Sequence, residues 1–271
     1  MAKTLEGDRL QYEEKTQTYR TEIAGISKWE AQMLEELEQR DSASKRFALA
    51  EGMFNLTSYH ILLNSISQAV LRINNEEALG EARKSISRGF GYLEDLVTGY
   101  VDAPFSDYAE KVAALEGVDG NRRYNLVRKI GLAIQLFQNS YRDNSKWRWT
   151  FVETEGRFAA IAKNLIDMAN INANLDPRSS VYESTAYHLR LIKRLLNEAS
   201  DRYRERYEQA TNHINDFQAS LNFMNALRRL HIILGESGEA ETIKKKVDVW
   251  EAKMQGDLNK KQEDKIAEAT S

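Results

Sequence analysis

The sequence predicts an all-α protein, an elongated bundle of long antiparallel helices with coiled-coil-like packing. The chain of 271 residues contains only 2 prolines and 14 glycines, and 29% of its residues are charged, a composition that favours helices. The run from Arg178 to Leu234 contains neither glycine nor proline. In two segments, apolar residues are separated alternately by three and four positions, the spacing of a helix that packs against a partner helix. No segment carries the alternation expected of a strand.

Residues 1–116 are expected to form three long helices and a short one. The second helix, over about 43–73, has no charged residue from Gly52 to Leu71. We therefore expect this helix at the centre of the bundle, enclosed by other helices. The first helix, over about 5–40, carries an imperfect heptad seam that consists of Tyr12, Thr16, Tyr19, Ile23, Ile26, Glu30, Met33 and Leu37.

The third helix is expected after the turn at Asn74-Asn75, because acidic residues follow that turn and suit the first turn of a helix. It should extend to about Tyr100, and a short helix should cover 106–115. The loop at 116–120 is the best candidate for a boundary. Glycines within the third helix predict close helix contacts or local bends, at Gly80, Gly89, Gly91 and Gly99.

Residues 121–258 are expected to form the C-terminal part, although the two parts could also be one continuous domain. Two helices should precede one long helix over 178–234. Asp176-Pro177 suits the start of this helix and Gly235 suits its end. Such a helix would be roughly 85 Å long.

The long helix carries a candidate coiled-coil seam, which predicts a left-handed supercoil with another helix. A last amphipathic helix should fold back after the turn at 235–238, and residues 259–271 should form a charged, frayed tail. A tetratricopeptide-like array is the alternative architecture, less favoured because most of the expected helices are too long for that repeat. The seam residues are Tyr203, Tyr207, Ala210, Ile214, Phe217, Leu221 and Met224.

The sequence offers no pattern of catalytic or metal-binding residues. It contains no cysteine, which excludes disulfides, thiolate metal sites and a cysteine nucleophile. The four histidines, His60, His188, His213 and His231, occur in none of the spacings used by zinc or di-iron sites. We therefore predict no catalytic residue, no metal and no cofactor, and a protein that is not an enzyme.

One segment, residues 121–163, combines an excess of basic residues with interleaved aromatic residues. This combination suits a patch for phosphate, RNA or an acidic partner. The plainer interpretation is that the tryptophans are buried on one side and the cations are solvated on the other. The candidate binding patch consists of Arg122, Arg123, Arg128, Lys146, Trp147, Arg148 and Trp149.

Together these features predict a non-enzymatic structural or scaffolding protein that binds a protein partner, or itself as a homo-oligomer, through helix–helix contacts. One alternative is a nucleic-acid or acidic-ligand binding module that uses 121–163. Another is a peripheral membrane-shaping helical dimer, which the net charge of −3 disfavours. The first residues lack the apolar core of a signal peptide, and no stretch is apolar enough for a transmembrane helix. We expect a soluble, cytoplasmic protein.

Overall fold

The computed structural model describes residues 2–115, 117–141 and 147–269, and over these ranges it contains helices, turns and loops but no strand. The prediction of an all-α fold is therefore confirmed. The elements are α1 (Ala2–Gln39), α2 (Ala43–Val70), α3 (Glu76–Leu96), the 3₁₀ turn η1 (Phe105–Asp107), α4 (Ala109–Ala113), α5 (Gly120–Ser140), α6 (Thr150–Asn164), α7 (Ile171–Asn174), α8 (Tyr182–Arg206), the π-helical turn η3 (Tyr207–Thr211), α9 (Ile214–Ile233) and α10 (Ser237–Ala269).

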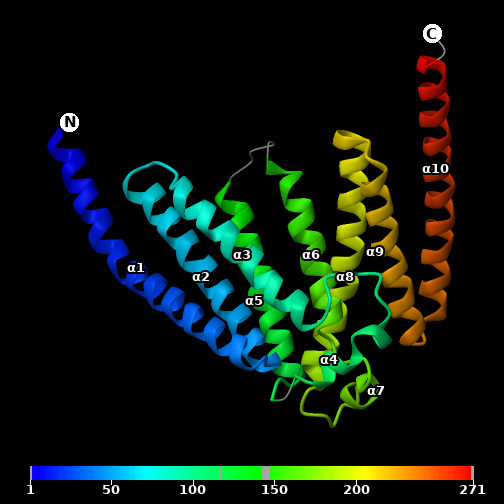
Figure 1. The fold of residues 1–271 in the computed structure, drawn as a ribbon, viewed down its shortest axis with the longest axis horizontal. Helices are drawn as coiled ribbons and strands as arrows, with labels where there is room; N and C mark the ends of the chain where they lie inside the picture. Colours follow the sequence, from blue (N-terminus) through cyan, green and yellow to red (C-terminus); the bar gives the residue numbers. More distant parts are fainter. Residues whose placement is uncertain (1, 116, 142–146, 270–271) are drawn as a thin grey trace.

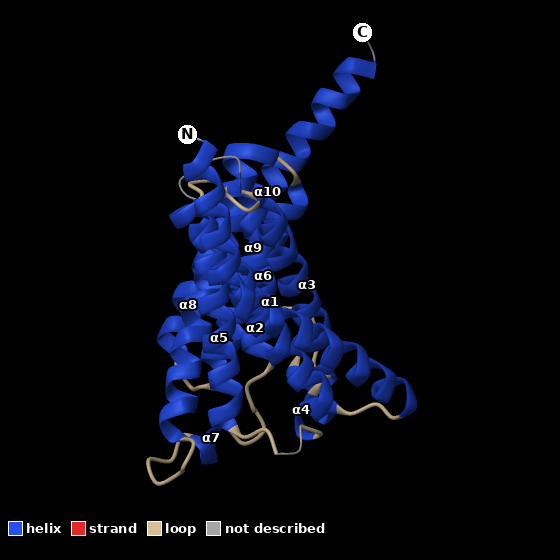
Figure 2. Cartoon of the chain, turned by 90° about the vertical axis from the view of Figure 1, so that its left-hand side faces the viewer, coloured by secondary structure: helices blue, strands red, loops and turns tan. Residues whose placement is uncertain are grey.

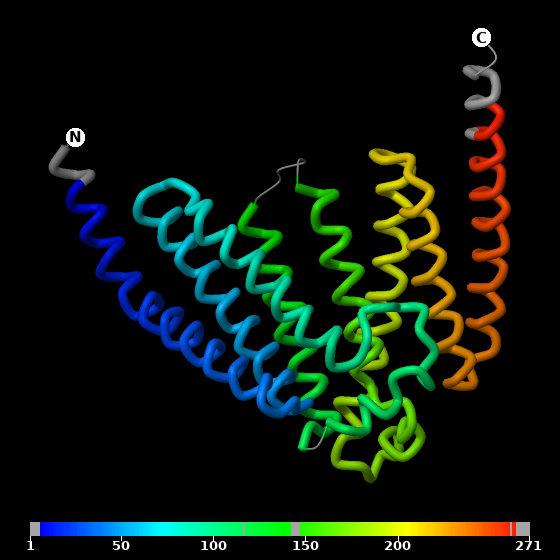
Figure 3. Tube along the Cα trace, in the orientation of Figure 1, coloured from blue at the N-terminus to red at the C-terminus, as the bar shows by residue number. Residues whose placement is uncertain are grey.

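The long helices stand side by side and alternate in direction, from α1 at one edge to α10 at the other (Figure 1, Figure 3). The hairpins α2–α3, α5–α6 and α8–α9 form the body, and α5 contacts α2, α3, α6 and α8. Helix α1 covers α2, and α10 packs against α9. The short helices α4 and α7 lie with connecting loops at one end of the bundle (Figure 2). Hairpins stacked in this way form the body of α-solenoids.

Helix α2 lies at the centre of the N-terminal hairpins, as its uncharged stretch predicted. It packs against α1, α3 and α5, and Phe47, Met53 and Phe54 are fully buried. One hydrophobic cluster joins Phe54 to residues of α5, α6, α8 and α9, so residues of both predicted parts share a core.

The seam of α1 is used against α2 within the same chain. Its two polar members are buried and have hydrogen-bond partners: Thr16 bonds the Tyr12 carbonyl at 2.8 Å. Glu30 accepts from Arg88 at 2.5 Å and from the Tyr92 hydroxyl at 2.7 Å. Polar residues therefore fit this seam because Thr16 bonds the backbone of α1 itself and the neighbouring helix α3 supplies both partners of Glu30.

The predicted single helix over 178–234 is wrong, because the chain breaks and reverses after Arg206. The π-helical turn η3 follows α8, Asn212 adopts the left-handed conformation with φ 49°, and α9 then folds back along α8. Asparagine tolerates this conformation better than most residues. Asp216, in the first turn of α9, accepts hydrogen bonds from Thr211 and Arg206, and a carboxylate at that position stabilises the new helix start.

The seam residues are consequently divided between α8, the turn η3 and α9, and the two helices pack on each other. The rings of Tyr207 and Phe217 have centroids 5.0 Å apart, and those of Tyr203 and Phe223 lie 5.5 Å apart. Leu221 and Met224 are also buried, Ile214 is half-buried and Ala210 is exposed in the turn. The seam is therefore covered within one chain by the α8–α9 hairpin, without a second molecule.

Replacing Asn212 with valine is expected to lower the free energy of unfolding by about 1–2 kcal/mol, because a β-branched residue is strained at positive φ. The matched variant Asn212→Gly adopts this conformation freely and should lie within about 0.5 kcal/mol of the wild type. Urea denaturation of both variants measures the difference. Equal stability of the two variants would show that the left-handed residue does not determine the break.

The C-terminal segment also differs from its prediction. Helix α10 continues to Ala269, beyond the end near residue 258 that was expected, so the described part of the charged tail over 259–271 is helical. The segment contains Ala, Lys, Glu and Gln without proline, and these residues have high helix propensity. The first half of α10 is anchored on α9 by Val247 and Trp250, which are buried.

Candidate functional site

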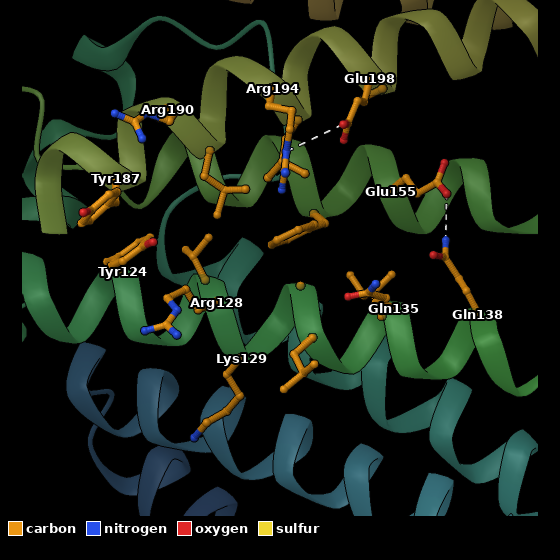
Figure 4. A pocket seen from close by; sticks show the side chains of 18 of the residues that line it. Tyr124, Arg128, Lys129, Gln135, Gln138, Glu155, Tyr187, Arg190, Arg194 and Glu198 are labelled. Carbon is orange, nitrogen blue, oxygen red and sulfur yellow. Dashed lines mark hydrogen bonds and ion pairs between the residues drawn. The ribbon is translucent and has the colours of Figure 1, made fainter.

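A groove of about 1140 Å³ runs between α5 and α8, with α6 behind it (Figure 4). Both helices run in the same direction, so their first turns lie at one end of the groove and their last turns at the other. The residues that line it are Tyr124, Asn125, Val127, Arg128, Lys129, Gly131, Leu132, Ile134, Gln135, Gln138, Glu155, Phe158, Tyr187, Arg190, Leu191, Arg194, Leu195, Glu198, Ala199 and Arg202.

Helix α5 presents one polar face to this groove because its opposite face is apolar and buried. Asp119 caps the helix by accepting a hydrogen bond from the Arg122 backbone at 2.8 Å. Leu126, Ile130 and Phe137 point into the core. The residues at 124, 128, 131, 135 and 138 follow the helical period and line the groove.

Helix α8 is built in the same way. His188, Leu189, Ile192 and Leu196 are buried against the body. Residues 187, 190, 191, 194 and 198 then lie on the side that faces α5 across the groove. The basic residues of this face therefore come from a helix that starts about forty residues beyond the end of α5 in sequence, beyond the predicted basic segment.

A glycine on α5 allows α6 to form the floor of the groove. A Cβ atom at Gly131 would lie 3.2 Å from Cζ of Phe158, so the aromatic ring packs directly on the backbone of α5. Glu155, on the same helix, accepts hydrogen bonds from Gln138 at 2.7 Å and from Arg202 at 3.0 Å. These contacts link α5, α6 and α8 at the end of the groove farthest from Tyr124.

Two stacked tyrosines form the other end. The ring centroids of Tyr124 and Tyr187 are 6.2 Å apart with an interplanar angle of 19°. The Arg128 guanidinium lies 5.7 Å from the Tyr124 ring, and that of Arg190 lies 5.6 Å from the Tyr187 ring. Tyr187 is 48% exposed, so this cluster of rings and cations is open to a ligand. Cation–π contact restrains both guanidinium groups.

The charges along the groove are unequally balanced. Within the described residues, Arg128, Lys129 and Arg190 have neither an ion pair nor a hydrogen bond from their side chains. At the far end, Arg202 pairs with Glu155 at 3.0 Å, and Arg194 lies 3.7 Å from Glu198. The groove is therefore cationic at the tyrosine end and nearly neutral at the other.

The predicted patch is not assembled in one place. Arg122 pairs with Glu51 at 3.2 Å on the side towards α2. Arg123 is buried, and its guanidinium donates hydrogen bonds to backbone carbonyls. Burial also lowers the pKa of Arg123. Arg123 thus has a structural position, and of the described patch residues Arg128 alone lines the groove.

The tryptophan end of the patch lies elsewhere. Trp147 and Trp149 are both half-buried, and the Trp147 ring lies 4.9 Å from that of Tyr141. Arg148 covers Trp149 at 4.7 Å and pairs with Glu205 at 2.9 Å. Lys146 lies outside the described residues. The plainer interpretation, buried rings with cations on the surface, describes this corner better than a stacking platform.

Sequence reasoning missed the α8 half of the groove, namely Tyr187, Arg190 and Arg194. These residues fell within the long helix expected over 178–234, and nothing in their spacing links them to α5. The signal for the break before α9 was present in Thr211, Asn212, Asn215 and Asp216, because Thr, Asn and Asp favour turns and helix starts.

His188 is buried beside the tyrosine end of the groove, and its burial predicts that the stability of the fold depends on pH. One ring nitrogen lies 2.9 Å from the Ala162 carbonyl, and the ring centroid lies 6.0 Å from that of Tyr124. Burial lowers the pKa of His188 from 6.5 to about 4. Between these values the unfolded chain binds a proton that the folded chain does not, so stability falls as the pH falls.

We expect this histidine to lower the free energy of unfolding by about 2 kcal/mol between pH 7 and pH 5. The variant His188→Gln removes the titrating group and should show a flatter pH dependence over that interval. Urea denaturation of both proteins at pH 7, 6 and 5 measures the two slopes. Identical slopes would mean that His188 does not remain neutral in the folded chain.

Among the described residues, no cluster of histidine and carboxylate side chains is arranged to hold a metal ion. No helix in the described ranges has both the length and the apolar character required to cross a membrane. The fold and the groove thus define an all-α protein of stacked helical hairpins with an open, partly cationic cleft.

Residues 8–258 match the TP0443 family, and the chain belongs to that family. No curated protein and no solved structure matches it.

Proposed function

We propose that this chain is a non-enzymatic scaffolding protein that binds another protein through the groove between α5 and α8. The observation that supports this most directly is the combination of unpaired cations with exposed aromatic and aliphatic side chains in one elongated cleft. Tyr187 is 48% exposed and Leu132 is 57% exposed, and apolar side chains left open in this way favour a protein ligand. Side-by-side hairpins also give extended surfaces of the kind that repeat proteins use for binding.

The nucleic-acid alternative is supported less well. Glu155 and Glu198 line the same groove as the cations and would repel phosphates there. Most other cations of the basic segment have intramolecular partners, as for Arg157 with Glu94 at 2.7 Å. A nucleic-acid ligand needs several free cations along its path, and the membrane-shaping alternative needs a dense basic surface.

Self-association and the cytoplasmic location also remain predictions. Light scattering at several protein concentrations tests self-association.

Photo-crosslinking from inside the groove tests the proposal. Gln135 is exposed and lines the groove, and replacing it with a photoreactive amino acid in the full chain, expressed in its own cells, samples the occupant. Gln218 on α9 is exposed but does not line the groove, so the same replacement there is the matched control. We expect a discrete protein adduct from position 135 that is absent from position 218. Adducts with nucleic acid alone, or none, would overturn the proposal.

A further inference from the structure

The distribution of charge and apolar surface along the groove specifies the kind of segment that it binds. We infer that the α5–α8 groove binds an acidic amphipathic helix of a partner protein. Its carboxylates lie over Arg128, Lys129 and Arg190, and its apolar side chains lie against the leucines beyond them. This inference rests on the proposed function and adds the chemistry of the bound segment.

Free cations at one end call for carboxylates on the ligand. Arg128, Lys129 and Arg190 have no ion-pair partner among the described residues, unlike Arg202 of the same groove. The guanidinium groups of Arg128 and Arg190 are already held over the rings of Tyr124 and Tyr187, at 5.7 Å and 5.6 Å. Because this restraint precedes binding, less side-chain entropy is lost when a carboxylate arrives. Hydrogen bonds between guanidinium and carboxylate groups are among the stronger ones in proteins.

The apolar residues follow the cations at a helical interval. Leu132 comes one turn after Arg128 on α5, and Leu191 and Leu195 are one turn apart on α8. Each interval is about 6 Å along the helix axis. A ligand helix has the same rise per residue. An acidic residue on it can therefore lie over a cation of the groove while an apolar residue three or four positions later contacts a leucine. The groove from Tyr124 to Gln138 is about 21 Å long, enough for roughly four turns.

The far end of the groove determines which end of the ligand is acidic. There Glu155 is already bonded by Gln138 at 2.7 Å and Arg202 at 3.0 Å, and Glu198 lies near Arg194. Further carboxylates at this end would be repelled, so the acidic residues must lie at the tyrosine end. A uniformly charged polymer such as nucleic acid places phosphates along its whole length and fits this arrangement poorly. The asymmetry therefore favours a protein helix with charge at one end.

Charge reversal combined with the groove crosslink tests the inference. The variant Arg128→Glu with Arg190→Glu reverses the free cations in the chain that carries the photoreactive residue at 135. The control, Arg83→Glu with Lys244→Glu, changes the net charge equally at exposed positions on α3 and α10, where no ion pair is present among the described residues. All four substituted side chains are exposed, so circular dichroism should show wild-type folding for both variants.

We expect at least a tenfold loss of the protein adduct in the groove variant and no more than a twofold change in the control. Mass spectrometry of the adduct should identify a segment with several Asp or Glu residues beside apolar residues at helical spacing. An adduct that survives the groove reversal, or a crosslinked segment that is neutral or basic, would overturn this inference while the proposed function stands. The absence of any protein adduct in the parent chain would overturn the proposed function itself.

Discussion

Replacing Arg123 with methionine is expected to lower the free energy of unfolding by about 3–5 kcal/mol. The guanidinium is buried and donates hydrogen bonds to the carbonyls of Val118 at 2.9 Å, Val112 at 3.1 Å and Leu165 at 3.3 Å. These carbonyls belong to α4, to the loop before α5 and to the end of α6. Methionine fills similar volume but donates nothing, and each buried polar group left without a partner costs about 1–3 kcal/mol.

The neighbouring residue provides the control for this prediction. Arg122 is exposed and pairs with Glu51 at 3.2 Å, so Arg122→Met should cost no more than about 1 kcal/mol. Chemical denaturation of both variants, with the melting temperature as a second measure, gives the comparison. If the two substitutions cost the same, Arg123 is not the residue that joins these segments.

Replacing Gly89 with alanine is expected to destabilise the protein by about 2–3 kcal/mol. A Cβ atom at this position would lie 2.9 Å from the Phe54 ring and 3.2 Å from Cβ of Met53. Both residues are fully buried in α2, so neither can move without disturbing the core. Overpacking a filled core typically costs about 1–3 kcal/mol, more than alanine gains in helix propensity.

Gly91 lies on the same helix and is the matched control. A Cβ atom there would have no atom within 4 Å, so Gly91→Ala should raise the free energy of unfolding by about 0.5–1 kcal/mol. Opposite signs for the two substitutions, measured by thermal and urea denaturation, are the expected outcome. A stabilising effect at Gly89 would show that α2 and α3 are not in close contact at this point.

These two predictions concern residues that the sequence identified but could not assign. Gly80, Gly89 and Gly91 all indicated close contact or bending, and of these the contact occurs at Gly89. Arg123 and Arg128 both belonged to the candidate patch. The former is enclosed by backbone carbonyls, whereas the latter lies beside Tyr124 in the groove. Arg123 and Arg128 are five positions apart on α5 and therefore lie on different faces of the helix. The neighbours of each face come from other helices.

The helix break at Asn212 shows a different limit of sequence reasoning. The heptad spacing from Tyr203 to Met224 identified residues that are mostly buried, but spacing alone does not distinguish one helix from two helices that pack on each other. The absence of glycine and proline suggested continuity. Yet the left-handed conformation needs only a residue that tolerates it, and Asn212 does so at φ 49°.

The sequence by itself determined that this chain is helical, that α2 is central and that the apolar residues of α1 and α9 face partners. Those properties depend on local helix propensity and on hydrophobic periodicity, both of which are set by the order of neighbouring residues in the chain. Tertiary structure alone decided that α8 turns back into α9 and that α5 and α8 lie side by side. It also decided which cations remain without partners, because that depends on carboxylates from helices distant in sequence. The groove has no counterpart in any single segment, since α5, α6 and α8 each contribute one wall.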